Sequence, residues 1–185
     1  YRFGADGETG KARIECHDNN RSETELVAIP LKVPGLHNVS NAAGALVIAR
    51  MLGVVDVVAL PALAEFGGLA HRLEFVREHD GVRYYNDSKA TSPEAAMTSL
   101  RAFDCPVVIL VGGSDKGGSF GEFGECLARN AKAVVCIGQT GPAIAMALHE
   151  AEARRGSALP RAAGGQSADS FSDAVESARG LASRG

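Results

Sequence analysis

The sequence contains few aromatic residues, few cysteines and no long apolar run, and the last two absences exclude whole classes of protein. Among its 185 residues there is no tryptophan, and only 5% are aromatic. The four cysteines, at positions 16, 105, 126 and 136, form no C-x-x-C pair, so neither a disulfide framework nor a cysteine-rich zinc site is expected. No apolar stretch reaches the roughly 18 residues of a membrane span, and the N-terminal residues lack the layout of a signal peptide. We therefore predict a cytoplasmic chain with no membrane partner.

An excess of basic charge is also missing. Lys and Arg number 19 against 22 Asp and Glu, which gives a formal net charge of -3. Proteins that bind nucleic acid neutralise phosphates with clustered Lys and Arg, and no such cluster is present. We therefore expect no nucleic-acid partner. The 45% hydrophobic content suits a globular chain of one domain, or of one domain plus part of another.

The first third of the sequence predicts a sheet edge followed by two helices. Three short β-type segments, 1–3, 12–16 and 26–33, are separated by Gly- and Asn-rich turns. Apolar residues at helical spacing then predict helices over 38–52 and 57–66. Since Gly67 and Gly68 form a flexible pair, we predict a linker over 67–70. It would separate a domain of residues 1–66 from one of residues 71–185.

Beyond this linker, predicted strands and helices alternate. The predicted strands are 73–78, 82–85, 107–111, 133–137 and a short one near 161–163, and the helices are 93–103, 120–130, 142–153 and 171–182. The segments PVVILV and AVVCI are continuous apolar runs, as expected where helices cover both faces of a parallel sheet. The fold class is therefore α/β, with a Rossmann-like, doubly wound and mostly parallel sheet. Its ligand crevice should lie at the carboxyl ends of the strands, in loops 86–92, 112–119 and 138–141.

The first of these loops, YYNDSKATSPEAA, concentrates groups that could bind a ligand. Asp87 and Ser88 can contact sugar hydroxyls, and Lys89 supplies a cation for phosphate or carboxylate. Thr91 or Ser92 can cap the helix that follows. A plain capped loop is the alternative interpretation. We expect this loop to lie beside the second one, as the ends of neighbouring parallel strands.

The other two loops are rich in glycine. In VGGSDKGGSF the glycines would admit a ligand to the backbone, and Lys116 would attract an anion. The segment Gly138 to Gly141 resembles the start of a dinucleotide fingerprint but lacks its third glycine. It leaves open an alternative function, a non-catalytic Rossmann-like nucleotide-binding module. The Walker-A-like GADGETGKA has alanine where the first glycine should be, so we predict a hairpin turn there.

Histidines offer no metal site, because none has a partner at the spacing of metal ligands. Three of the five, at 17, 79 and 149, lie among polar or helical surface residues. Only His37 and His71 fall at joints between predicted elements, and His71 stands beside Arg72.

Four motifs resemble those of the Mur ligases in order and approximate spacing: LHNVSNAAGAL, GLAHRLEFV, YYNDSKATSPEAA and ILVGGSDKGGSF. The first two are also similar to folylpolyglutamate synthases, whereas the last two resemble the D-glutamate-adding Mur ligases. The resemblance implies that 71–185 is the C-terminal domain of such an enzyme, lacking its last strand and loop. It further implies that 1–66 is the C-terminal part of the central ATP-binding domain.

The resemblance implies a reaction as well. ATP would phosphorylate the carboxylate of UDP-N-acetylmuramoyl-L-alanine, and the amine of D-glutamate would attack the acyl phosphate, in peptidoglycan precursor synthesis. ATP and Mg²⁺ would be held mainly by a part of the enzyme outside this chain. We therefore expect these 185 residues to make no peptide bond by themselves, and we expect a monomer.

Residue roles follow from the same resemblance. On the amino-acid side, Thr91 and Lys116 would hold the α-carboxylate of D-glutamate, with Ser88 also contacting substrate. Arg72 would reach the ATP phosphates as a catalytic group. By the same resemblance, Lys89 would be a second catalytic group.

On the nucleotide side, Asn41, with Asn38 nearby, would face the adenine. Asp87 would bind the ribose, and Arg72 would complete this set.

Overall fold

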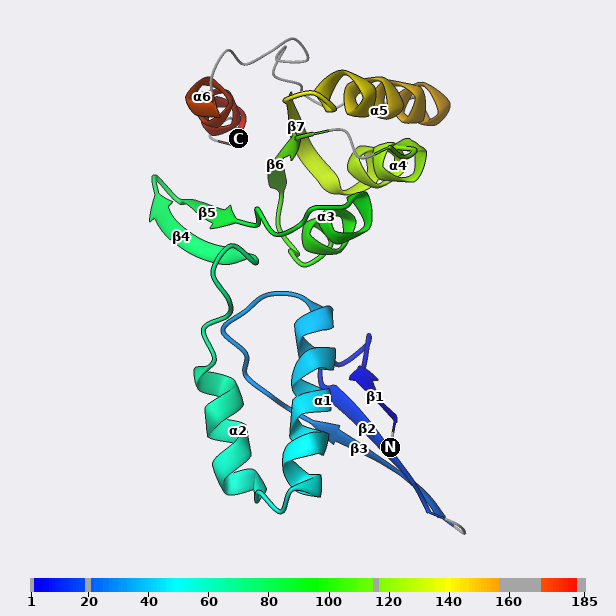
Figure 1. Cartoon of the computed structure of the whole chain (residues 1–185), viewed down its shortest axis with the longest axis vertical. Helices are drawn as coiled ribbons and strands as arrows, with labels where there is room; N and C mark the ends of the chain where they lie inside the picture. The colour runs from blue at the N-terminus through cyan, green and yellow to red at the C-terminus, as the bar shows by residue number, and fades with distance from the viewer. Residues whose placement is uncertain (1, 19–20, 115–116, 157–170, 183–185) are drawn as a thin grey trace. The chain divides into compact units, whose positions relative to one another are not determined.

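The computed structural model describes residues 2–18, 21–114, 117–156 and 171–182 (Figure 1). The chain divides into two compact units. One consists of residues up to Phe75 together with Tyr85–Lys89, and the other of Val76–Tyr84 together with the described residues from Ala90 onward. Among the described residues, no helix combines the length and the apolar character that crossing a membrane requires.

The first unit packs helices on a small antiparallel sheet. Its strands β1 (Arg2–Ala5), β2 (Ala12–Asp18) and β3 (Arg21–Val27) are paired in that order. Helix α1 (Leu36–Met51) lies against β1 and β2, and α2 (Asp56–Glu65) lies against α1. The core contains Ala12 and Ile14 of β2 with Ala43 and Leu46 of α1, all buried.

The Walker-like segment is a hairpin turn, as predicted. Asp6 N donates to Lys11 O at 2.8 Å, which closes the turn between β1 and β2. The buried Asp6 carboxylate accepts bonds from Thr9 Oγ1 and Thr9 N, both at 2.8 Å, and from Arg13 Nη2 at 2.6 Å. These bonds, that of the Thr9 hydroxyl first, hold the pKa of Asp6 well below its ordinary value. The turn's donors therefore bind the protein's own carboxylate.

The predicted strand over 26–33 is wrong, because the strand is β3 and ends at Val27. Its pairing with β2 extends from Ala12 opposite Val27 to Asp18 opposite Arg21. This register places polar residues of the RSETELV segment in the ladder. Beyond it, Pro30 and Pro34 have no backbone N–H to donate, so the ladder does not continue.

Strands β4 (Glu74–His79) and β5 (Val82–Asn86) form a two-stranded hairpin. Its two-residue loop, Asp80 and Gly81, has φ values of 51° and 75°. Positive φ at both positions is typical of the type I′ turn that closes hairpins. We expected β5 to be the neighbour of the strand at 107–111 in a parallel sheet. That expectation is wrong for the described residues, in which β5 is paired with β4 and the strand at 107–111 is paired with the one at 131–137 in a separate sheet.

After the hairpin, the second unit continues in the predicted α/β order with helix α3 (Pro93–Leu100) and strand β6 (Val107–Gly112). The remaining described elements are α4 (Gly121–Asn130), β7 (Ala131–Ile137), α5 (Gly141–Arg155) and α6 (Phe171–Ala182). Strands β6 and β7 are parallel, with Gly112 opposite Ile137 at their carboxyl ends. The short strand predicted near 161–163 lies outside the described residues.

Helices cover both faces of the β6–β7 pair, which explains the continuous apolar runs. Helices α4 and α5 contact one face and α6 contacts the other. Along β7 the side chains alternate: Val134 and Cys136 face α4 and α5, whereas Val135 packs with Ala174 and Ala178 of α6. Every second residue therefore meets a different helix layer, and both must be apolar.

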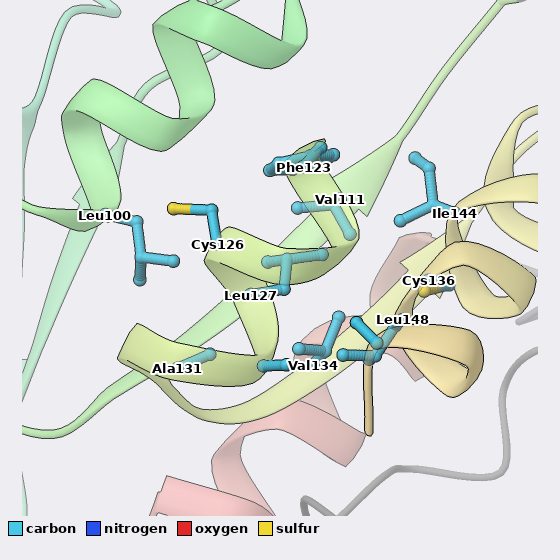
Figure 2. Packing of buried hydrophobic residues seen from close by; sticks show 12 residues of the cluster. Leu100, Val111, Phe123, Cys126, Leu127, Ala131, Val134, Cys136, Ile144 and Leu148 are labelled. Atoms are coloured by element: carbon cyan, nitrogen blue, oxygen red, sulfur yellow. The ribbon is translucent and has the colours of Figure 1, made fainter. Parts of the chain in front are cut away.

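The core under α4 and α5 is built mainly from aliphatic side chains (Figure 2). Leu127 and Leu148 are completely buried, and Phe123 is the aromatic residue among the fully buried members of this cluster. Burying a leucine contributes on the order of 1.5–3 kcal/mol, so a few such residues provide much of the stability of a small unit.

Candidate functional site

A strained turn precedes β4 and carries Arg72. Its neighbours His71 and Leu73 have φ values of 65° and 44°, although neither is a glycine. Such a conformation costs on the order of 1–3 kcal/mol per residue and persists only where surrounding bonds enforce it. Within the turn, Arg72 N donates to Leu69 O at 3.1 Å, while the Arg72 side chain is exposed.

The segment after β5 is bonded directly to this turn. Asp87 Oδ1 accepts a hydrogen bond from Leu73 N at 3.0 Å, and Lys89 N donates to His71 O at 3.0 Å. Residues 71–73 and 87–89, which are separated in the sequence by the whole hairpin, are therefore fastened side by side. The structure brings together Arg72 and Asp87, two of the residues predicted for the site.

Asn86 joins the same two segments through its side chain. Its Nδ2 lies 2.8 Å from His71 Nδ1 and 3.4 Å from Glu74 Oε2, and its Oδ1 accepts from Ser88 N at 3.1 Å. Glu74 Oε2 also accepts from His71 N at 2.8 Å. The exposed Ser88 and Lys89 therefore follow a segment whose backbone is held at several points.

The first turn of α1 contributes His37, Asn38 and, one turn further on, Asn41. Half-buried His37 has its pKa lowered, first by burial and then by the positive charge of Arg72, with Asp87 acting in the opposite direction. Asn38 Nδ2 donates to Pro34 O at 2.7 Å, and exposed Asn41 donates to Asn38 Oδ1 at 3.4 Å. The charges of Arg72 and Asp87 thus act on His37 in opposite directions.

Two glycine-containing loops meet at the carboxyl ends of β6 and β7. Thr140 is buried, and both its N–H and its hydroxyl donate to Gly113 O, at 3.1 and 3.3 Å. Gly141 N donates to Gly138 O at 3.1 Å. These backbone donors of the dinucleotide-like segment are therefore already used within the protein, which argues against a pyrophosphate site there.

The remaining predicted residues are not joined to the Arg72 turn by any described contact. Ser92 caps α3, because its Oγ accepts from Ala95 N at 3.3 Å, and exposed Thr91 precedes it. Thr91 belongs to the second unit and Asp87 to the first. Lys116 lies outside the described residues. The predicted convergence of these three residues on one crevice, with Thr91 and Lys116 on the amino acid and Asp87 on the adjacent nucleotide, stays a prediction.

Comparison with known proteins decides the family. The family model described as "Mur ligase, glutamate ligase domain" matches residues 71–185, which is more than half of the chain. The chain belongs to the Mur ligase family.

Two curated relatives of this Mur ligase chain carry the same name. The UDP-N-acetylmuramoylalanine–D-glutamate ligase of Pelotomaculum thermopropionicum is 42% identical over 129 residues, covering 70% of this chain and 28% of the relative. The enzyme of the same name from Latilactobacillus sakei is 37% identical over 131 residues, covering 71% of this chain and 29% of the relative. The chain thus spans less than a third of the length of these relatives.

Solved structures agree on the fold. The UDP-N-acetylmuramate-alanine ligase MurC of Thermotoga maritima superposes with a TM-score of 0.55 at 19% identity, over 94% of this chain and 43% of that one. MurF of Acinetobacter baumannii superposes with a TM-score of 0.50 at 24% identity, over 82% of this chain and 32% of that one. The predicted α/β fold of the Mur ligase C-terminal domain is confirmed.

Two residues of the bonded turn in this Mur ligase chain were not singled out from sequence. Asn86 and Glu74 each contact His71, but the sequence gives no signal that their side chains share one partner. The position of His71 at a joint between elements was the single available hint.

Proposed function

We propose that the protein containing this chain is an ATP-dependent ligase that joins D-glutamate to UDP-N-acetylmuramoyl-L-alanine. The curated relatives named above support the substrate pair. The observation that carries the proposal here is the hydrogen bond between Leu73 N and Asp87 Oδ1, which fastens the arginine-bearing turn to the NDSK loop. The turn then offers the guanidinium of Arg72 to nucleotide phosphates, and the adjacent loop offers the carboxylate of Asp87 to the ribose.

Asp87 and Arg72 would bind different parts of ATP. The bond from Leu73 N fixes one carboxylate oxygen of Asp87, so the other can accept from a ribose hydroxyl in a defined orientation. The exposed guanidinium of Arg72 can form two parallel bonds to phosphate oxygens and stabilise the charge that develops in phosphoryl transfer. Asn41, supported by Asn38, would face the adenine.

On the amino-acid side, Thr91, Ser88 and Lys116 would bind D-glutamate. A dianionic amino acid needs cations and hydroxyl donors, which this loop composition supplies. Lys89 would act beside Arg72 as a second cation near the reacting groups.

The reaction requires one phosphoryl transfer and one displacement. The terminal phosphoryl group of ATP passes to the alanyl carboxylate, and ADP leaves. The amine of D-glutamate then attacks this acyl phosphate, forms the amide bond and releases phosphate. Within this chain, the role of Arg72 is to neutralise phosphate charge, and the role of Asp87 is to orient the nucleoside.

Mg²⁺ would be bound by another part of the protein. The described residues contain no group of three or more His, Cys, Asp or Glu side chains that could hold a metal ion. No step is therefore assigned to Mg²⁺ on the described part of the chain, and its ligands would come with the phosphate-binding loop of the central domain.

Residues 1–66 would be the C-terminal part of that central ATP-binding domain, with a linker at 67–70. Around α1 and α2 the first unit exposes large apolar side chains: Leu36, Ile48, Met51, Leu52, Val54, Val55, Val57 and Val58. Apolar groups gathered in this way mark a surface that another part of a protein covers. The rest of the central domain would bury it.

The test uses the full-length protein that contains this chain. We expect ADP release that requires both D-glutamate and UDP-N-acetylmuramoyl-L-alanine, with L-glutamate inactive. Arg72→Ala and Asp87→Ala should each lower kcat/KM about 100-fold or more, as for loss of a charged contact in the transition state. The control Arg154→Ala removes an exposed ion pair with Glu125 and should leave the kinetics unchanged. ADP release independent of D-glutamate would contradict the proposal.

A further inference from the structure

The strained turn needs bonds that enforce it, and the side chain of Asn86 provides the central ones. His71 and Leu73 both have positive φ, so the turn would relax if its partners were removed. The backbone bonds from Lys89 N to His71 O and from Leu73 N to Asp87 Oδ1 join the turn to the segment after β5. Asn86 lies at the start of that segment.

The orientation of the Asn86 amide is determined by its neighbours. Ser88 N is a backbone donor 3.1 Å from Oδ1, so the atom facing it must be the oxygen. The amide nitrogen therefore faces His71 Nδ1 at 2.8 Å and Glu74 Oε2 at 3.4 Å, and each can accept one of its two protons. A single amide thus connects both segments.

This arrangement also fixes the ring of His71. Since Asn86 Nδ2 donates to Nδ1, that nitrogen must be unprotonated, and the neutral ring carries its proton on Nε2. The backbone N–H of His71 donates to Glu74 Oε2 at 2.8 Å, the same oxygen that faces Asn86. Side chain and backbone of His71 are therefore held by one cluster of three residues.

We propose that Asn86 is a positioning residue, which holds the His71–Leu73 turn so that Arg72 and Asp87 face the same nucleotide. The proposal rests on the function given above. Asn86 itself contacts no substrate in it. Without the amide, the turn relaxes toward negative φ, Leu73 N loses its alignment with Asp87, and the guanidinium and the carboxylate no longer keep a fixed relation.

Two substitutions separate the halves of the amide in the full-length protein. Asn86→Ala removes both the donor and the acceptor. Asn86→Asp retains the acceptor for Ser88 N but replaces the donor with a carboxylate oxygen that repels Glu74. If the donor half holds the turn, both variants should raise KM for ATP by about tenfold, the loss expected for one well-made hydrogen bond, while KM for D-glutamate changes less than about twofold.

The matched control is Asn130→Ala. Asn130 is exposed, whereas Asn86 is half-buried, but the amide of Asn130 is engaged in the same way: its Nδ2 donates to Cys126 O at 2.8 Å inside the second unit. Its loss should lower the melting temperature without changing KM for ATP. Two results would show that Asn86 is not a positioning residue. One is a wild-type KM for ATP in Asn86→Asp. The other is a parallel rise of the KM values for ATP, D-glutamate and UDP-N-acetylmuramoyl-L-alanine that follows the loss of melting temperature.

A readout independent of activity distinguishes this proposal from the function on which it rests. In wild type, ¹⁵N NMR should show His71 with its proton on Nε2, and the amides of Leu73 and Lys89 should be protected from hydrogen exchange. Asn86→Ala should accelerate both exchange rates by about fivefold or more. If wild type releases no ADP with D-glutamate, the function fails while these rates still decide the positioning role. Unchanged rates and an unchanged tautomer would overturn the positioning role even in an active ligase.

Discussion

Replacing Gly112 with alanine should separate the carboxyl ends of β6 and β7. Gly112 has a φ of 141°, and an added Cβ would lie 1.8 Å from Ile137 O on the adjacent strand. That contact involves backbone on both sides, so no side-chain rotation can relieve it. Either the strands move apart or the loop that follows Gly112 changes conformation.

The size of the effect follows from two contributions. Backbone strain for a non-glycine residue in this region costs on the order of 1–3 kcal/mol. Overpacking against a fixed backbone oxygen adds roughly another 1–3 kcal/mol. The adjacent Gly113 is a matched control, because its φ is 152° but nothing lies within 4 Å of its added Cβ. Gly113→Ala should therefore show the strain contribution alone.

Urea unfolding of the chain, followed by far-UV circular dichroism, measures the difference. Gly112→Ala should lower the free energy of unfolding of the second unit by about 2–6 kcal/mol, and by roughly 1–3 kcal/mol more than Gly113→Ala does. Equal losses in the two variants would show that Gly112 does not approach Ile137 as described, and the close packing of these two loops would be refuted.

Three further changes test other parts of the structure. Gly124→Ala should lower the unfolding free energy by about 1–2 kcal/mol although alanine favours helix, because its Cβ would meet Ala147 O at 2.5 Å; a stabilised variant would refute the close α4–α5 contact. Ser92→Ala should cost about 1 kcal/mol by urea titration through loss of the α3 cap, and no loss would contradict the capping bond. The lowered pKa of His37 means that the folded state binds this proton less tightly than the unfolded state, so stability should fall as the pH drops below about 6.5. Arg72→Ala should raise the pKa of His37 in an NMR titration. An unchanged pKa would show that the charge of Arg72 does not act on His37.

How much of the fold can be predicted from sequence depends on whether its cause is local or distant. The apolar runs of β6 and β7 identify buried parallel strands, because a side chain that is buried on either face of the sheet must itself be apolar. The end of β3 at Val27 is set by pairing with β2, which lies elsewhere in the chain. Likewise, the Asp80-Gly81 pair indicates a hairpin, but we placed β5 beside β6 by following the doubly wound pattern.

The candidate site shows the same division. Motif residues identify Arg72 and Asp87 as candidates, yet only coordinates reveal that Leu73 N joins their segments. The role of Asn86 depends on which way its amide faces, and that is decided by the position of Ser88 N. Sequence spacing carries no information of this kind, since it does not specify the direction of a side-chain dipole.

Incorporation of labelled D-glutamate tests the central claim most directly. The full-length protein should convert UDP-N-acetylmuramoyl-L-alanine, ATP and labelled D-glutamate into one UDP-linked product, with one ADP released per amide bond formed. Asp87→Ala should lower the rate of this incorporation about 100-fold or more at limiting ATP. Transfer of label from L-glutamate at an equal rate, or no UDP-linked product with any amino acid, would contradict the account.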